Sequence, residues 1–296
     1  MKRIYLILPI LAGMMFGSSG IFVRTLTQNG IDPTTLLFLR FSIAIIPLLI
    51  AILATDKNLF KINLKDIPLF LVCSLCIIGL NLCYNHSMNT VPLSLAAVLL
   101  SIAPIYVLII AYFLFGENIT SKKLICMILA ISGCIMMTGV LEINFENIPL
   151  LGILSGIGAG LFWAVYLMAS KKSIENGKHT FTILFYSIIF ISIALIPFSD
   201  FGEISNFISI NPMLTVIFLI LHSTFSFALP YILSTISLNY MDSGTSSIFL
   251  SGAEPFAALI FGLLIYSEVP TPLMFCGFIL TIIAMMMLSK TDSKTS

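Results

Sequence analysis

The chain has little charge for its length. Of its 296 residues, 9% are Asp, Glu, Lys or Arg, while 59% are hydrophobic. A soluble domain normally carries roughly a quarter charged residues, so an ordinary soluble fold is excluded. The formal net charge is +1, and it predicts neither a nucleic-acid partner nor a strongly charged protein partner.

Recognisable catalytic motifs are also missing from the sequence. It contains no G-x-S-x-G, no H-E-x-x-H and no P-loop. We therefore expect no enzyme activity, no cofactor and no bound metal. Without an ATP site, any transport would have to run on an ion gradient, on exchange or downhill.

The cysteines give no disulfide signal. All six lie inside apolar runs, and Cys73 and Cys76 form a C-x-x-C. That spacing occurs in redox and metal sites. No second cysteine pair and no His-rich tract lie nearby in the sequence, so we interpret both residues as packing residues of one hydrophobic helix.

Long apolar runs dominate what is present. A bilayer core about 30 Å thick needs roughly 20 apolar residues per helix. The sequence divides on that scale into ten segments, at residues 4–23, 34–54, 67–88, 93–114, 123–140, 150–170, 181–198, 213–238, 245–266 and 273–288. The first segment resembles a signal peptide, but it continues to Val23 and many spans follow, which favours a retained helix. The fold class predicted is an all-α integral membrane protein with ten transmembrane helices.

The basic residues predict an orientation. If the N-terminus is cytoplasmic, 12 of the 14 Lys and Arg residues fall in cytoplasmic segments, as the positive-inside rule requires. The exceptions are Arg24, at an outer end, and Arg40, within a span. We expect a multi-pass protein of the cell membrane with both termini in the cytoplasm.

An internal repeat relates the two halves. Pro104 and Glu117 are thirteen residues apart, and so are Pro255 and Glu268, at an offset of 151. The first segments of the halves also align at an offset of 147, with the pairs Gly13 and Gly160, Phe16 and Trp163, and Arg24 and Lys171. The sequence thus predicts two five-helix units, residues 4–140 and 150–289. Because five is odd, the second unit enters the membrane from the opposite side, giving the inverted repeats that recur in transporters.

Several local motifs resemble one known family. They are the two Pro-to-Glu helices, Phe16-Gly17-Ser18, Leu39-Arg40-Phe41 and Phe162-Trp163-Ala164. With these motifs the chain resembles the drug/metabolite transporter superfamily, specifically its EamA-type members, over about residues 4–289. One departure is Phe16, where such proteins often carry Trp.

The resemblance implies a ten-helix basket. Segments 4–23, 67–88, 93–114, 150–170, 213–238 and 245–266 would surround a central cavity, and segments 123–140 and 273–288 would lie outside it. Export is the direction that the family's habits imply.

Glu254 is the clearest candidate for function. It lies about ten residues into segment 245–266, where an ionisable group is costly and by default functional. Pro255 follows it and is expected to disturb the helix. At helical spacing Ser247 and Ser251 share its face. If this face lines a cavity, Glu254 binds a substrate amine or carries a coupling proton; alternatively the face is a tight helix seam, with Glu254 paired to Arg40.

Arg40 has two interpretations. Its forked donors suit an anion or carboxylate clamp, whereas an intramembrane ion pair or snorkelling to the interface would make it structural. The structural role is favoured by the sequence alone.

Other polar or aromatic residues at membrane depth complete the candidate site. Such groups must find partners in a lipid environment, and either substrate or neighbouring backbone can supply them. They are Asn81, Tyr84, His222, Ser18 and Trp163. Pro104 and Pro255 are predicted to disrupt helices, and Glu117 and Glu268 to serve the repeat structurally.

The sequence as a whole predicts a secondary transporter of small metabolites. Amino acids or related compounds, and amphipathic drugs, are the expected substrates, moved by alternating access around a midplane cavity, as a monomer or homodimer in the bilayer. The alternatives are an importer or exchanger of another solute, such as a sugar phosphate or vitamin, and, from outside transport, a membrane-embedded enzyme or a structural subunit.

Overall fold

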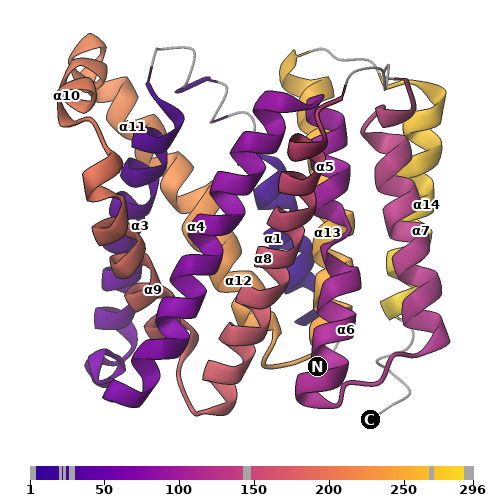
Figure 1. Ribbon diagram of the computed structural model, residues 1–296, viewed down its shortest axis with the longest axis horizontal. Helices are drawn as coiled ribbons and strands as arrows, with labels where there is room; N and C mark the ends of the chain where they lie inside the picture. Colours follow the sequence, from indigo (N-terminus) through magenta and orange to yellow (C-terminus); the bar gives the residue numbers. More distant parts are fainter. Residues whose placement is uncertain are drawn as a thin grey trace.

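The computed structural model describes residues 5–19, 22, 25–26, 31–142, 148–266 and 270–289, and within these ranges the regular structure is helical throughout. The helices stand side by side in one bundle (Figure 1). Seven helical stretches are long and apolar enough to cross a membrane: Pro33–Thr55, Leu64–Thr90, Leu93–Phe115, Leu150–Glu175, Thr180–Phe198, Pro212–Ser237 and Pro272–Ser289. The protein is therefore a multi-pass membrane protein.

The long helices coincide closely with the predicted segments. They are α3 (Pro33–Thr55), α4 (Ile67–Thr90), α5 (Leu93–Ser101), α6 (Ala103–Phe115), α8 (Leu150–Glu175), α9 (Thr180–Leu195), α11 (Pro212–Ser223), α12 (Leu229–Ser237), α13 (Ser243–Tyr266) and α14 (Pro272–Ser289). Two shorter apolar helices are α1 (Ile7–Gly17) and α7 (Ser121–Met137). α10 (Phe201–Ile210) was not predicted from the sequence. Because α1, α7 and α13 are not among the seven stretches, a count of ten spans stays a prediction.

Local sequence signals explain where helices begin and end. Asp32 precedes α3 and its carboxylate accepts hydrogen bonds from the N–H groups of Thr34 and Thr35, at 2.8 and 3.1 Å, which is the usual N-cap arrangement. Asp200 caps α10 in the same way. α6 ends at Gly116, whose φ of 64° is a left-handed conformation that glycine adopts without strain.

The two prolines expected to disrupt helices behave differently. At Pro104 the helix is interrupted, since α5 ends at Ser101 and α6 begins at Ala103. At Pro255 the prediction of a disturbed helix is wrong at the level of helix continuity, because α13 runs through it without a break. Pro255 still lacks the N–H that would bond the Ser251 carbonyl one turn earlier. A π-helix at Thr224–Ala228 separates α11 from α12 and was not predicted.

The two halves pack on each other in an exchanged pattern. α1 packs on α13 and α12, while α8, the first helix of the second half, packs on α5, α6 and α4. The second helices of the halves, α3 and α9, pair with each other, and so do the fifth helices, α7 and α14. Figure 1 shows α7 and α14 at one edge of the bundle and α3 and α9 toward the other. Exchanging the halves leaves this set of contacts unchanged.

Equivalent helices of the two halves run in opposite directions. The Thr182 and Tyr186 hydroxyls, near the start of α9, donate to the carbonyls of Leu59 and Phe60, just after α3 ends. At the other end the Asp200 N–H, after α9, donates to the Thr35 hydroxyl, near the start of α3. α3 and α9 are therefore antiparallel, as inverted repeats require.

Glycines allow the closest helix contacts. A Cβ added at Gly13 or Gly17 would collide with the carbonyl oxygens of Leu250 and Glu254, respectively, on α13. In α8, a Cβ at Gly156 would meet Leu99 of α5. Small residues at four-residue spacing let helix backbones approach in lipid, and this feature holds α1 and α8 against their partners.

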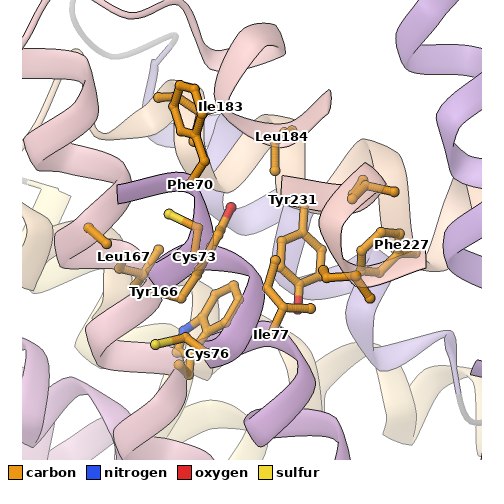
Figure 2. Packing of buried hydrophobic residues seen from close by; sticks show 14 of the residues in the cluster. Phe70, Cys73, Cys76, Ile77, Tyr166, Leu167, Ile183, Leu184, Phe227 and Tyr231 are labelled. Carbon is orange, nitrogen blue, oxygen red and sulfur yellow. The ribbon is translucent and has the colours of Figure 1, made fainter. Parts of the chain in front are cut away.

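Aromatic and aliphatic side chains fill the interior, with Phe70, Ile77, Tyr166 and Leu184 among those fully enclosed (Figure 2). Cys73 and Cys76 lie in the same cluster, 0% and 5% exposed. Both cysteines of the C-x-x-C pack among the hydrophobic side chains of this cluster.

Candidate functional site

Glu254 lies in the middle of α13, on a helix wedged between α1, α6 and α7. Its side chain is partly buried. No ion pair joins its carboxylate to any residue in the described ranges. An ionisable side chain at this depth without a fixed partner is costly to maintain, so the carboxylate is available for a mobile partner.

Three side chains from three other helices lie within electrostatic range of Glu254. They are Tyr84 of α4, Cys134 of α7 and Tyr231 of α12. The Cys134 thiol donates to the Ser101 hydroxyl at 3.1 Å, which joins α7 to the break between α5 and α6. Glu254 and Tyr84, both candidates from the sequence, are thus brought together in one polar region.

A cluster of aromatic rings occupies the space beside this region. Trp163 stacks on Tyr166 with ring centroids 5.3 Å apart, and meets Phe16 and Tyr231 edge-on, each at 5.5 Å. Tyr231 also contacts Phe227, and Figure 2 shows these two rings side by side. Trp163 is 5% exposed, so in this conformation it fills the centre of the bundle.

Arg40 also lies within electrostatic range of Tyr231. Its Nη2 donates to the Asn81 side-chain oxygen at 2.5 Å, and Asn81 in turn donates to the Ile77 carbonyl. The guanidinium lies over the rings of Phe41 and Phe227, 5.2 and 5.3 Å from their centroids. Among the described residues no carboxylate forms an ion pair with Arg40, so the pairing with Glu254 that the sequence suggested is not formed.

Several buried polar atoms near the centre have no hydrogen-bond partner. Arg40 Nε, both ring nitrogens of His222 and the Ser226 hydroxyl are in this group, and so is the hydroxyl of Ser247. Native structures rarely leave such atoms unpaired. They lie on α3, α11, the π-helix and α13, and bound water or a ligand can satisfy such atoms.

Two of the candidate serines lie elsewhere. The Ser18 hydroxyl donates to the Met15 carbonyl at 2.6 Å and so closes the last turn of α1. Ser251 faces a seam with Ser101, Pro104 and Met127 that is too narrow for a water molecule. The helix-seam interpretation therefore fits Ser251 better than cavity lining does.

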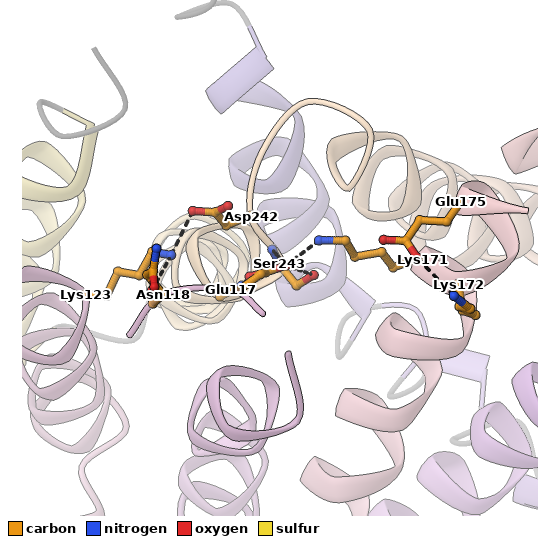
Figure 3. A network of polar contacts seen from close by, with 9 residues as sticks. Glu117, Asn118, Lys123, Lys171, Lys172, Glu175, Asp242 and Ser243 are labelled. Atoms are coloured by element: carbon orange, nitrogen blue, oxygen red, sulfur yellow. Dashed lines mark hydrogen bonds and ion pairs between the residues drawn. The ribbon is translucent and has the colours of Figure 1, made fainter. Parts of the chain in front are cut away.

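Glu117 organises one end of the bundle (Figure 3). Its carboxylate pairs with Lys171 of α8 and accepts from the N–H and hydroxyl of Ser243, at 2.9 and 2.8 Å, and from the Gly244 N–H. Glu117 thereby caps α13 from a distant loop, where the helix dipole favours negative charge. Its counterpart Glu268, like Arg24, lies outside the described residues.

The surroundings of Glu117 set its charge. Burial raises the pKa of its carboxyl group, but the hydrogen bonds from Lys171 and Ser243 and the Lys171 charge outweigh burial and hold the pKa below the ordinary 4.5. Nearby, Lys123 pairs with Asp242 at 2.8 Å and Figure 3 shows this pair beside the first. Two ion pairs, Glu117 with Lys171 and Lys123 with Asp242, thus connect the helices at this end of the bundle.

Sequence reasoning missed the central place of Tyr231 and the role of the π-helix. Tyr231 lies within electrostatic range of both Glu254 and Arg40, but only its polarity is visible in the sequence. A π-turn has no sequence signature as distinct as a proline or a cap, although such turns are frequent at functional sites.

Comparison with known proteins agrees with this architecture. The family model described as the EamA-like transporter family matches twice, at residues 3–139 and 150–290. The chain is 27% identical to an uncharacterized transporter of Archaeoglobus fulgidus over 88% of this chain and 87% of that one, and 26% identical to the uncharacterized transporter YetK of Bacillus subtilis over 89% and 81%.

A relative with a named activity is the threonine/homoserine exporter RhtA of Escherichia coli, 27% identical over 66% of this chain and 62% of that one. A protein of known crystal structure shares the fold with a TM-score of 0.80 at 14% identity, over 98% of this chain and 96% of that one. Because the family model covers nearly the whole chain in two copies, this protein belongs to the EamA-like transporter family of the drug/metabolite transporter superfamily.

Proposed function

We propose that this transporter is a secondary active exporter of amino acids or closely related metabolites, driven by protons through Glu254. The observation that carries the proposal is the polar centre of the bundle, where Glu254 has no ion-pair partner among the described residues and lies within electrostatic range of Tyr84 and Tyr231. Unpaired ionisable groups inside transporters serve as relays for protons or as substrate contacts.

The exchanged packing of the two halves supports alternating access. Units 4–140 and 150–289 would act as inverted repeats. The packing of α1 on α12 and α13 has its counterpart in the packing of α8 on α4, α5 and α6. A bundle with such symmetry has two mirror-related packings that open to opposite sides around a fixed site. Ten crossings, with both termini in the cytoplasm, complete this proposal, as a monomer or homodimer.

The substrate class is supported by relationship and by chemistry. The exporter RhtA, named for threonine and homoserine, is similar over two thirds of this chain. The centre described here offers a carboxylate, a guanidinium and aromatic rings, which suit a small zwitterion. Export is the direction in the name of that relative.

The test is flux in proteoliposomes with a panel of labelled L-amino acids, with and without a pH gradient. Wild type is expected to carry at least one amino acid faster with the gradient, and Glu254→Gln to lose that acceleration. Glu175→Gln is the matched control, because Glu175 is an exposed carboxylate paired at 3.4 Å with Lys172 away from the centre. Gradient-dependent flux that survives in Glu254→Gln would refute the coupling role.

A further inference from the structure

Arg40 is the one feature of the centre that the proposed coupling role of Glu254 does not use. It is a cation at membrane depth in α3, held by Asn81 and two phenylalanine rings. These contacts supply one neutral hydrogen-bond acceptor and no negative charge. Placing a charged group in this environment without a counter-charge is expensive.

The four ion pairs between described residues are Lys123 with Asp242, Lys171 with Glu117, Lys172 with Glu175, and Lys178 with Asp66. None of these four ion pairs includes Arg40. The Nε–H of Arg40 is buried and has no acceptor. The guanidinium therefore keeps at least one N–H that can donate to a planar anion, and a carboxylate has the shape that fits its paired donors.

Other groups without hydrogen-bond partners among the described residues lie on α11 and the π-helix, both of which pack against α3. His222 is fully buried, neither ring nitrogen has a partner, and it lies within electrostatic range of Arg40. Ser226, one turn further along, is 2% exposed with a free hydroxyl. A neutral imidazole and a hydroxyl can each donate one hydrogen bond to an oxygen anion.

The backbone here is specialised as well. Ser226 lies within the π-helix Thr224–Ala228, and Phe227 of the same turn carries the Arg40 guanidinium on its ring. The extra residue of a π-turn displaces the following side chains from ordinary helical register, and such turns are frequent at functional sites. Phe227 thus contacts the guanidinium directly, and Ser226 is its neighbour in the chain, in a turn that packs against α3.

We propose that Arg40, His222 and Ser226 form the subsite that binds the carboxylate of the transported substrate. The inference rests on the proposed transport function and adds to it, because it assigns the anionic group of the substrate to α3, α11 and the π-helix, apart from Glu254. Tyr231 lies within electrostatic range of both Arg40 and Glu254. The carboxylate supplies the counter-charge that Arg40 lacks among the described residues.

The first experiment needs no mutation. Thermal unfolding of the purified full chain in detergent, in methanesulfonate salts, is measured with each L-amino acid and with its α-amide, which differs only at the carboxylate. We expect at least one amino acid to stabilise the protein and its amide to bind about tenfold or more weakly, as the loss of a charge-assisted hydrogen bond implies. Amides that bind as well as their acids would overturn the assignment, and so would a panel in which no acid binds.

Variants then locate the subsite. Arg40→Gln is expected to abolish the difference between acid and amide, and Arg40→Lys to retain part of it, since a single ammonium lacks the fork. Lys172→Gln, which removes the same charge from an exposed position, should bind like wild type. If Arg40→Gln does not fold, the test rests on Arg40→Lys. A variant Arg40→Lys that discriminates between acid and amide as well as wild type does would contradict binding by the paired donors of the guanidinium.

A parallel measurement with chloride salts distinguishes a substrate carboxylate from a simple inorganic counter-ion as the anion that Arg40 binds. Chloride that stabilises wild type as well as any amino acid does, through Arg40, would identify a counter-ion site and overturn the inference. The transport proposal is tested independently by flux measurements. If the amides are transported as fast as the amino acids, the carboxylate subsite alone is contradicted. If amino acids bind through their carboxylate but no flux occurs, the transport proposal alone is contradicted.

Discussion

Removing the charge of Glu117 is expected to loosen one end of the bundle. Glu117→Gln keeps the shape of the side chain and one oxygen acceptor for Ser243, but leaves Lys171 without its partner. The side chains of Glu117 and Lys171 are only 7% and 15% exposed. Breaking a buried pair from one side costs about 3–5 kcal/mol.

Two features reduce that cost. Lys171 lies over the Phe115 ring at 4.9 Å, which retains some stabilisation of the cation, and it is close enough to the end of α8 to reach water. We therefore expect the free energy of unfolding to fall by about 2–3 kcal/mol. This figure covers both the broken ion pair and the weaker capping of α13.

The assay is equilibrium unfolding in mixed micelles, with Asp242→Asn as the control. Asp242 pairs with Lys123 at the same end, and the two side chains are 47% and 9% exposed, respectively. Because Asp242 is open to solvent and Lys123 keeps its hydrogen bond to the Asn118 carbonyl, we expect a smaller loss than for Glu117→Gln. Equal stabilities of the two variants would refute the view that Glu117 fastens α6, α8 and α13 together.

The same pair has a defined pH dependence. Because the pKa of Glu117 in the folded protein lies below the ordinary 4.5, its contribution is fully present above that value and is lost as the pH falls through the lower, folded pKa. The difference between wild type and Glu117→Gln should thus be constant near neutrality and shrink in acid. A difference that grows below pH 4.5 would contradict the sign.

Two further predictions concern packing and orientation. Gly13→Ala would press a methyl group against the Leu250 carbonyl and should lower the free energy of unfolding by about 1–3 kcal/mol, measured by thermal unfolding. Gly158→Ala is the control, because the nearest neighbour of the added Cβ would lie at 3.7 Å, and it should be neutral or slightly stabilising. Equal effects of the two variants would contradict the close packing of α1 on α13. A C-terminal green fluorescent protein fusion should fluoresce and a C-terminal alkaline phosphatase fusion should be inactive. In the predicted topology, 12 of the 14 Lys and Arg residues lie on the same side of the membrane as the termini, which is the cytoplasmic side by the positive-inside rule. The reverse pattern would refute cytoplasmic termini.

The sequence was sufficient to locate most helices. Apolar run lengths depend only on bilayer thickness, so the predicted segments 34–54 and 67–88 correspond to α3 and α4. The family followed from spaced motifs, and the double match of the family model confirms it.

The candidate site was less accessible to sequence reasoning. Which residues meet across the bundle depends on helix rotation and on which halves pair. Ser251 and Ser247 share a face with Glu254 by periodicity, yet Ser251 lies in a seam with α7. Arg40 was expected to be structural. Only the arrangement of α3 against α4 and the π-helix shows that it contacts Asn81 and aromatic rings but forms no ion pair in the described ranges.

The same limit applies to the prolines. Pro104 and Pro255 occupy equivalent positions in the repeat, but a proline only removes one donor and crowds one turn. Whether the helix then breaks depends on its neighbours. α13 is held by α1 through glycine contacts on both sides of Glu254, and it stays continuous.

The most direct test of the account compares two transport modes in the same proteoliposomes: counterflow of a labelled amino acid at equal pH, and its flux driven by a proton gradient. Counterflow needs alternating access but no proton coupling. The account predicts that wild type performs both and that Glu254→Gln retains counterflow while losing the gradient-driven flux. Wild type that performs neither, or Glu254→Gln that retains both, would contradict it.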